Sequence, residues 1–244
     1  MGSGVGITYL GQSTFRFVTP ESKTVLIDPL VASNPLCPPH EREVREVDLI
    51  LITHAHWDHL GDVLAIAREL SPTVVTIVEL GKWLSRQGLT NVEIMNIGGI
   101  VQFEGVTITM TPAAHSSSLE DEPDTYVGLA AGFVLEFSDG TRVYHAGDTA
   151  AFAGMRLIHE VHQPELAMLP IGDHHTMGPV EAAFATRLLN VDRVIPMHYG
   201  ITPGSEQAPA KYRQALDDIG LDRVETIQMT PGQTITWPPP RQPR

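Results

Sequence analysis

Four side chains able to bind a metal lie in one run of six residues, HAHWDH, at positions 54–59. The run follows an apolar segment that predicts a strand and precedes a pattern that predicts a helix. His54 and His56 are two residues apart, so in extended backbone both imidazoles face one side and can bind one ion. Asp58 and His59 begin the next turn and point in another direction. The spacing therefore favours two metal ions, one bound by each pair, over a plain helix-entry loop.

Three further candidate ligands follow predicted strands, where sites built on sheets gather. They are His115, Asp148 and His198. Taken singly, each is equally well explained as a hydrogen-bonding group at the surface. Taken with the first motif, His115 completes the first metal position, His198 completes the second, and Asp148 is free to bridge the two. This set of nitrogen and oxygen ligands predicts two divalent ions, with zinc expected and manganese or iron as alternatives.

The predicted elements explain how these residues are positioned. Short β-branched runs between turn residues predict strands at 7–10, 14–18, 24–27, 49–53, 74–78, 106–110, 132–137, 142–145, 166–169 and 193–197. Apolar residues three or four apart predict helices at 60–70, 80–87, 180–189 and 208–219. Continuous apolar strands indicate sheets that helices cover. The sequence therefore predicts an α/β protein with a single domain, residues 1–244, made of two similar halves that meet near residue 112.

Composition limits the partners of the protein. Sixteen Lys and Arg stand against 29 Asp and Glu, a formal net charge of −13, which disfavours long nucleic acid and anionic lipid surfaces. No apolar run reaches the roughly 20 residues of a membrane span, and a single cysteine cannot form an internal disulfide. We therefore expect a cytoplasmic protein that acts on a small molecule, alone or as a homo-oligomer. Two bound cations would make the centre locally positive, so an anionic substrate is also compatible.

The sequence resembles the metallo-β-lactamase superfamily from about Ile7 to about Gly200. The motifs that carry this resemblance surround the candidate ligands: THAHWDHLGD at 53–62, TPAAHS at 111–116, HAGDT at 145–149 and PMHYG at 196–200. The sequence is more narrowly similar to a branch of metal-dependent hydrolases related to ascorbate-phosphate lactonases and to the phospholipase D that cleaves N-acyl phosphatidylethanolamines. The branch motifs are YLG at 9–11, LIDP at 26–29, AGFV at 131–134, PIGD at 170–173 and TMGP at 176–179.

The resemblance implies an αββα four-layer sandwich, in which helices flank two mixed β-sheets and a binuclear site lies at one edge of both sheets. It also implies hydrolysis by a metal-bound hydroxide, with Asp148 as the bridging ligand. We therefore expect a hydroxide between the two ions to attack a small ester or lactone, with Asp58 orienting the nucleophile. A phosphodiesterase acting on a small or lipid-like phosphodiester is the alternative. A non-catalytic metal-binding protein is less favoured because every proposed ligand is present, and His59 disfavours the flavin-linked di-iron members.

Two loops depart from the branch pattern. Gln12 stands where that branch commonly has histidine, and His174 and His175 precede TMGP where an aromatic, apolar residue is usual. Both loops lie near the site in the family fold, so Gln12, His174 and Tyr199 are candidates for substrate contact, and His175 for protonation of the leaving group. Neutral variation of surface loops is an equal alternative.

Three remaining features carry two interpretations each. Asp28 ends a predicted strand before Pro29, and either terminates the strand or orients a metal-binding histidine. His145 either packs in the core or supports the ligands from behind. The irregular segment 31–45 is either a lid over the site or a plain connector.

Overall fold

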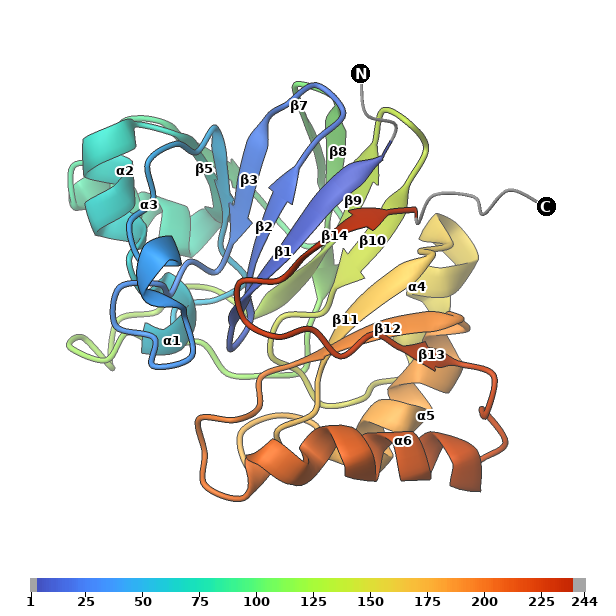
Figure 1. Ribbon diagram of the computed structural model, residues 1–244. Helices are drawn as coiled ribbons and strands as arrows, with labels where there is room; N and C mark the ends of the chain where they lie inside the picture. Colours follow the sequence, from blue (N-terminus) through green and yellow to red (C-terminus); the bar gives the residue numbers. More distant parts are fainter. Residues whose placement is uncertain (1–3, 239–244) are drawn as a thin grey trace.

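The protein consists of two seven-stranded sheets packed face to face, with helices on their outer faces (Figure 1). The computed structural model describes residues 4–238, so both ends of the predicted domain 1–244 lie outside the described residues. Each sheet is mixed, because one part is antiparallel and the other is parallel. The predicted α/β class and αββα sandwich are confirmed.

The first sheet is built almost entirely from the first part of the chain. Its strands, in spatial order, are β14 (Thr234–Trp237), β1 (Val5–Gly11), β2 (Thr14–Val18), β3 (Thr24–Ile27), β4 (Leu49–Leu51), β5 (Thr73–Ile77) and β6 (Val92–Met95). Its helical segments are η1 (Pro39–Glu41), α1 (Trp57–Leu60), α2 (Val63–Leu70) and α3 (Val78–Arg86). The strands from β3 to β6 run parallel, so their carboxyl ends meet at one edge.

The second sheet repeats this plan. Its strands, in spatial order, are β13 (Glu225–Thr226), β12 (Arg193–Met197), β11 (Leu166–Pro170), β10 (Arg142–His145), β9 (Ala131–Phe137), β8 (Val106–Pro112) and β7 (Ile100–Phe103). Its helical segments are α4 (Met155–His162), α5 (Pro179–Leu189), η2 (Ser205–Gln207) and α6 (Ala208–Asp218). The strands from β10 to β13 are parallel. Among residues 4–238, every helix is too short or too polar to span a membrane.

Strand β11 shows why the central strands are apolar throughout. Leu166 and Met168 belong to the core between the two sheets, whereas Ala167 and Leu169 pack in the core between the second sheet and its helices. Successive side chains of a strand point to opposite faces, so a strand buried on both faces needs an unbroken apolar run.

The chain passes from the first sheet to the second between Met95 and Ile100, earlier than the predicted meeting point near residue 112. Residue 112 instead ends β8, inside the second sheet. The sequence patterns also missed β6, β7, β13, β14 and α4. Strands β6 and β7 are short and partly exposed, so neither has the apolar run or clean alternation that predicts a strand.

Candidate metal centre

The first set of candidate ligands lies where two parallel strands of the first sheet end. Ile27 of β3 pairs with Leu51 of β4, so Asp28 and the 54–59 run leave the sheet at the same edge. The helix α1 begins at Trp57, which places His59 inside the helix, where its side chain is fully buried. The predicted loop therefore holds only His54 and His56. Asp58 and His59 lie in α1, a short helix that the patterns missed, and the predicted helix 60–70 corresponds to α2.

The second set comes from the corresponding edge of the other sheet. His115 follows β8, Asp148 follows β10 and His198 follows β12. Gly147 allows the chain to turn tightly before Asp148, since its φ is 62° and a Cβ there would lie 2.5 Å from the Ala131 carbonyl oxygen. Both halves of the chain thus deliver candidate ligands to one place.

The first group of ligand atoms consists of three imidazoles. His54 Nε2 lies 2.9 Å from His56 Nδ1, and His115 Nε2 lies 3.2 Å from the same atom. Burial lowers the pKa of all three histidines, and the charge of His59 adds to this effect. The rings are therefore neutral near pH 7, and each has a nitrogen lone pair to offer a cation.

The second group contains Asp58, His59, Asp148 and His198. Asp58 Oδ2 is 3.5 Å from His59 Nε2 and 3.4 Å from His198 Nε2. Ligand atoms about 2.0–2.2 Å from a tetrahedral zinc ion lie about 3.3–3.6 Å from one another, so these spacings suit one bound ion.

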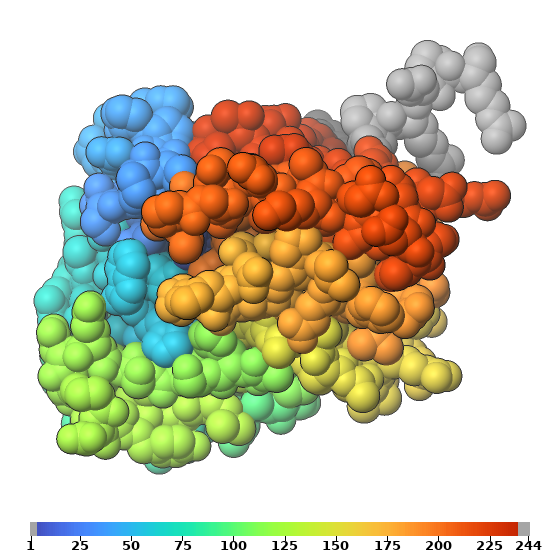
Figure 2. All heavy atoms as spheres, turned by 90° about the horizontal axis from the view of Figure 1, so that it is seen from below, coloured from blue at the N-terminus to red at the C-terminus, as the bar shows by residue number. Residues whose placement is uncertain are grey.

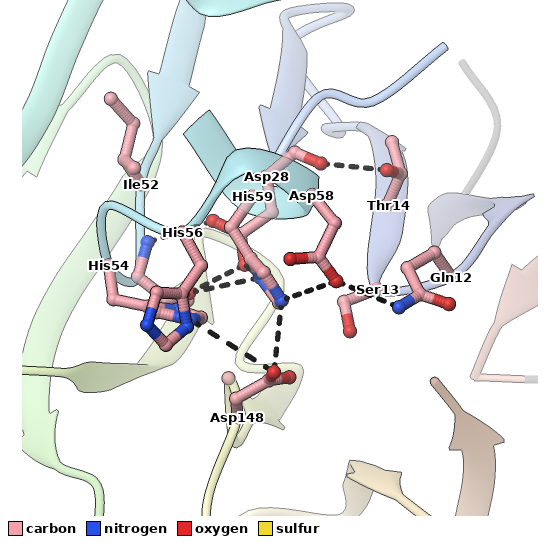
Figure 3. Close-up of polar contacts among 12 residues, drawn as sticks. Gln12, Ser13, Thr14, Asp28, Ile52, His54, His56, Asp58, His59 and Asp148 are labelled. Atoms are coloured by element: carbon pink, nitrogen blue, oxygen red, sulfur yellow. Dashed lines mark hydrogen bonds and ion pairs between the residues drawn. The ribbon is translucent and has the colours of Figure 1, made fainter. Parts of the chain in front are cut away.

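Asp148 lies between the two groups (Figure 3). Its Oδ2 atom lies within 4.0 Å of four ring nitrogens: 3.0 Å from His198, 3.2 Å from His59, 3.7 Å from His115 and 4.0 Å from His54. One carboxylate oxygen therefore faces ligands of both predicted ions.

Two buried atoms in this cluster make no well-formed hydrogen bond: Asp148 Oδ1, and His59 Nε2, although Asp148 Oδ2 lies 3.2 Å from the latter. Asp28 Oδ2 accepts a 2.7 Å hydrogen bond from His59 Nδ1, and the same carboxylate accepts bonds from the amide and hydroxyl of Thr53. With Nδ1 donating, the neutral form of His59 directs an unshared electron pair at Nε2 toward the centre. Because buried polar groups are seldom left unpaired, these residues fit a divalent cation.

The charges of the cluster also favour a bound divalent cation. Burial lowers the pKa of His198, but the Asp148 carboxylate outweighs it and raises that pKa to about 9. Asp148 and Asp28 likewise outweigh burial at His59 and raise its pKa well above the ordinary value. The second group thus has an excess of negative charge that attracts protons to its histidines, and a divalent cation would neutralise the same charge.

Five of the seven candidate ligands line a cleft of about 570 Å³, and His54 and His59 lie buried behind it. The lining residues are Gln12, His56, Trp57, Asp58, His115, Ser116, Asp148, His174, His175, His198, Ile201 and Thr202. Seen from below, the segments that carry them meet on one face of the molecule: the cyan region of α1, the green loop after β8, and the yellow-orange loop after β11 (Figure 2).

The structure brings three of the four predicted substrate-side residues into this cleft. Gln12 reaches it from the β1–β2 turn, and His174 and His175 reach it from the β11–α5 loop, with ring centroids 4.5 Å apart. Tyr199 is not among the lining residues. Its half-buried side chain packs against the core beneath helices α4–α6 instead.

The cleft also includes residues that the sequence patterns did not single out. The ring of Trp57 is 53% exposed, although it lies inside the metal motif, and Ser116, Ile201 and Thr202 complete the lining. Each of them lies within four residues of a candidate ligand in the sequence. This proximity is the sequence signal that could have identified them as lining residues.

Three ambiguous features have a defined place. Asp28 orients His59, as described above. The fully buried His145 accepts a hydrogen bond from the Gly147 amide and donates one to the Ser13 carbonyl oxygen, 2.9 Å away. The segment 31–45 is fixed at Asn34, whose buried amide donates to the carbonyl oxygens of Leu10 and Leu30. These contacts favour a connector over a lid.

Comparisons with known proteins agree with this arrangement. Residues 23–199 match the family model of the beta-lactamase superfamily domain. A UPF0173 metal-dependent hydrolase of Koribacter versatilis is 45% identical over 232 residues, which cover 95% of this chain and 97% of the relative. One of Methanopyrus kandleri is 43% identical over 229 residues, which cover 93% and 98%.

A solved structure shows the same fold. The metallo hydrolase Igni18 of Ignicoccus hospitalis is 37% identical and superposes with a TM-score of 0.84, covering 96% of this chain and 99% of its own. A fold of two seven-stranded mixed sheets and a cluster of histidines and aspartates at their shared edge accompany these similarities. The chain therefore belongs to the beta-lactamase superfamily and, within it, to the UPF0173 metal-dependent hydrolases.

Proposed function

We propose that the protein is a binuclear hydrolase that cleaves a small ester or lactone. The observation that carries this proposal is the position of Asp148 Oδ2, within 4.0 Å of histidines from both ligand groups. His54, His56 and His115 would hold one ion, and Asp58, His59 and His198 the other. Two ions held there would supply hydroxide near pH 7, because metal binding lowers the pKa of water from about 15.7 toward about 7.

The chain itself contributes orientation and proton transfer. Asp58 lines the cleft and is held by Gln12 and His198, so it is placed to orient the nucleophile. The single cysteine, Cys37, lies outside the cleft, and burial raises the pKa of its thiol to about 11. A thiolate nucleophile is therefore not part of the proposal.

The lining of the cleft favours a carboxylic ester or lactone over a phosphodiester. Within the described residues, no lysine or arginine lines it, and Trp57 and Ile201 add apolar surface. A phosphodiester carries a negative charge that lysine and arginine side chains commonly bind, whereas a neutral ester carbonyl needs no such cation. Zinc remains the expected metal, with manganese or iron as alternatives, because the ligands are nitrogen and oxygen atoms.

A second pocket of about 430 Å³ adjoins the cleft and offers one acidic and one basic side chain. The two share His174 and Thr202, and Asp173 and Lys211 line the second pocket. A small ester or lactone that extends from the metal centre into this pocket would meet charges of both signs, so the pocket favours a polar extension of either charge.

His175 is proposed to protonate the leaving group, because it lines the cleft from the β11–α5 loop and is not one of the predicted ligands. His175→Ala should lower kcat about 10²–10⁴-fold, the usual contribution of a general acid, and leave the metal content unchanged. Steady-state kinetics and metal analysis of the same preparation check this. Unchanged turnover with unchanged metal content would remove the role.

The proposed function is tested by metal analysis of protein purified without added metal, together with a substrate screen. We expect two ions per chain and metal-stimulated hydrolysis of an ester or lactone in a panel that also contains amides and phosphodiesters. Fewer than two ions per chain would overturn the binuclear assignment, and less than one ion, with no metal-stimulated hydrolysis, would overturn the proposal as a whole. Hydrolysis confined to phosphodiesters would replace it with the alternative substrate class.

A further inference from the structure

Gln12 contacts the second group of ligands although it is not a predicted ligand. Its Nε2 atom donates a 2.8 Å hydrogen bond to Asp58 Oδ2 (Figure 3). The same atom lies 2.9 Å from His198 Nε2. The residue is only 5% exposed. Gln12 therefore contacts one ligand from each half of the chain.

The backbone of Gln12 contacts one of these two ligands, His198. Its carbonyl oxygen accepts a 2.8 Å hydrogen bond from the His198 amide and a 3.2 Å bond from the Tyr9 hydroxyl. The turn itself is left-handed, with φ of 98° at Gly11 and 56° at Gln12. A non-glycine residue in this conformation is uncommon and strained, so surrounding contacts must offset the strain. These contacts define where the amide points.

The orientation of the amide follows from its neighbours. A carboxylate only accepts hydrogen bonds, so the atom 2.8 Å from Asp58 Oδ2 is the NH₂ group and not the carbonyl oxygen. Gln12 Oε1 is then buried without a partner. In this orientation the side chain donates to Asp58 although its own oxygen is unpaired. The hydrogen bond to Asp58 therefore determines how the Gln12 side chain is oriented.

We propose that Gln12 is a positioning residue that sets the affinity of the second metal position. Its side-chain NH₂ group fixes the Asp58 carboxylate, and its backbone carbonyl oxygen fixes the backbone of His198. Both ligands are therefore held in place before an ion binds. Outer contacts of this kind typically change metal affinity about 10–100-fold. This inference rests on the proposed binuclear function.

The test measures metal affinity in the absence of any substrate. Metal-free protein is titrated with Co²⁺ at pH 8, and the visible absorption reports both the affinity and the number of ligands at each position. We expect Gln12→Leu, which keeps the bulk but loses the donor, to bind the second ion about 10–100-fold more weakly, with the first ion unaffected. The absorption of the fully loaded variant should match that of the wild type.

Two further variants separate positioning from general damage. Gln12→His restores an N–H donor at the same place, and we expect it to recover most of the lost affinity. Gln102→Leu makes the same substitution at an exposed glutamine of β7 and should bind both ions as the wild type does.

The outcomes are distinguishable. A wild-type protein that binds fewer than two ions overturns the binuclear proposal and this inference with it. If the wild type binds two ions and Gln12→Leu binds both equally well, only the role of Gln12 is overturned. A loaded Gln12→Leu protein with a different number of ligands to cobalt also overturns it, because Gln12 would then be a ligand itself.

Discussion

Asp148 connects the two ligand groups and carries much of the charge between them. It is 2% exposed, and although burial alone would raise its pKa, the neighbouring charges of His59 and His198 hold that pKa well below the ordinary value. It is therefore a carboxylate near pH 7 despite its burial. A buried anion of this kind is stable only when cations or hydrogen-bond donors surround it.

Replacing Asp148 with alanine should remove at least one of the two proposed ions. The substitution deletes the only carboxylate whose oxygen lies within 4.0 Å of histidines from both groups among the described residues. We expect the affinity for at least one ion to fall by more than the roughly 100-fold loss of an outer contact. Metal content after dialysis checks this, with the exposed Asp192→Ala as the control. Full retention of both ions would contradict the bridging assignment.

The candidate ligands could be predicted from sequence because their spacing is local or falls at strand ends. His54 and His56 needed only the two-residue repeat of extended chain. The hydrogen bond between Gln12 and Asp58 joins positions 46 residues apart, and no local pattern reports which side chains meet across such a separation. The direction of Tyr199 depended likewise on how α4–α6 pack, which its motif does not contain.

Strand β10 joins the two sheets through its last residue. His145 donates to the Ser13 carbonyl oxygen of the β1–β2 turn, and its ring lies edge-on to Phe15 with centroids 5.6 Å apart. Burial lowers its pKa below the ordinary value, so the folded protein keeps the ring neutral at pH values where the unfolded chain binds a proton. The unfolded state is then favoured as pH falls below about 6.5.

His145→Gln should reduce this pH dependence. The glutamine amide can donate to Ser13 and its oxygen can accept from Gly147, but it does not titrate. As pH falls from 7.5 to 5.5, we expect the wild type to lose up to about 1.4 kcal/mol more unfolding free energy per pH unit below 6.5 than the variant. Urea unfolding of chelator-treated protein at both pH values measures the difference. Equal losses in the two proteins would show that His145 does not carry it.

The predicted elements that agree best with the structure are those buried on both faces. The run that became β4 and the run that became β11 are fully buried, and both were recognisable as apolar segments. Strand β14 has an exposed residue at every second position and is only four residues long, which also describes many loops. Its place was decided by pairing with β1 and not by its own residues.

Replacing Trp237 tests how much the contact between the two ends of the described chain contributes to the free energy of unfolding. Its ring is 2% exposed, belongs to the core between the sheets, and lies 5.2 Å from the Arg193 guanidinium of β12 in the other sheet. Trp237→Ala should therefore lower the free energy of unfolding by about 3–5 kcal/mol. Trp57→Ala removes a half-exposed ring and should change it by about 0.5 kcal/mol or less. Equal stability losses in chemical unfolding would contradict this assignment.

The pairing of β14 with β1 also bears on how the protein is made. Val5 pairs with Trp237 across these two strands. The first described strand to be synthesised, β1, therefore has no partner on this edge until the last described strand has been made. In a nascent chain this edge of β1 stays open until residues 234–237 have been made, and such edges attract other unfolded chains. Closing this contact also brings together distant parts of the chain, which slows folding. Early arrest of translation would leave the fragment prone to aggregation.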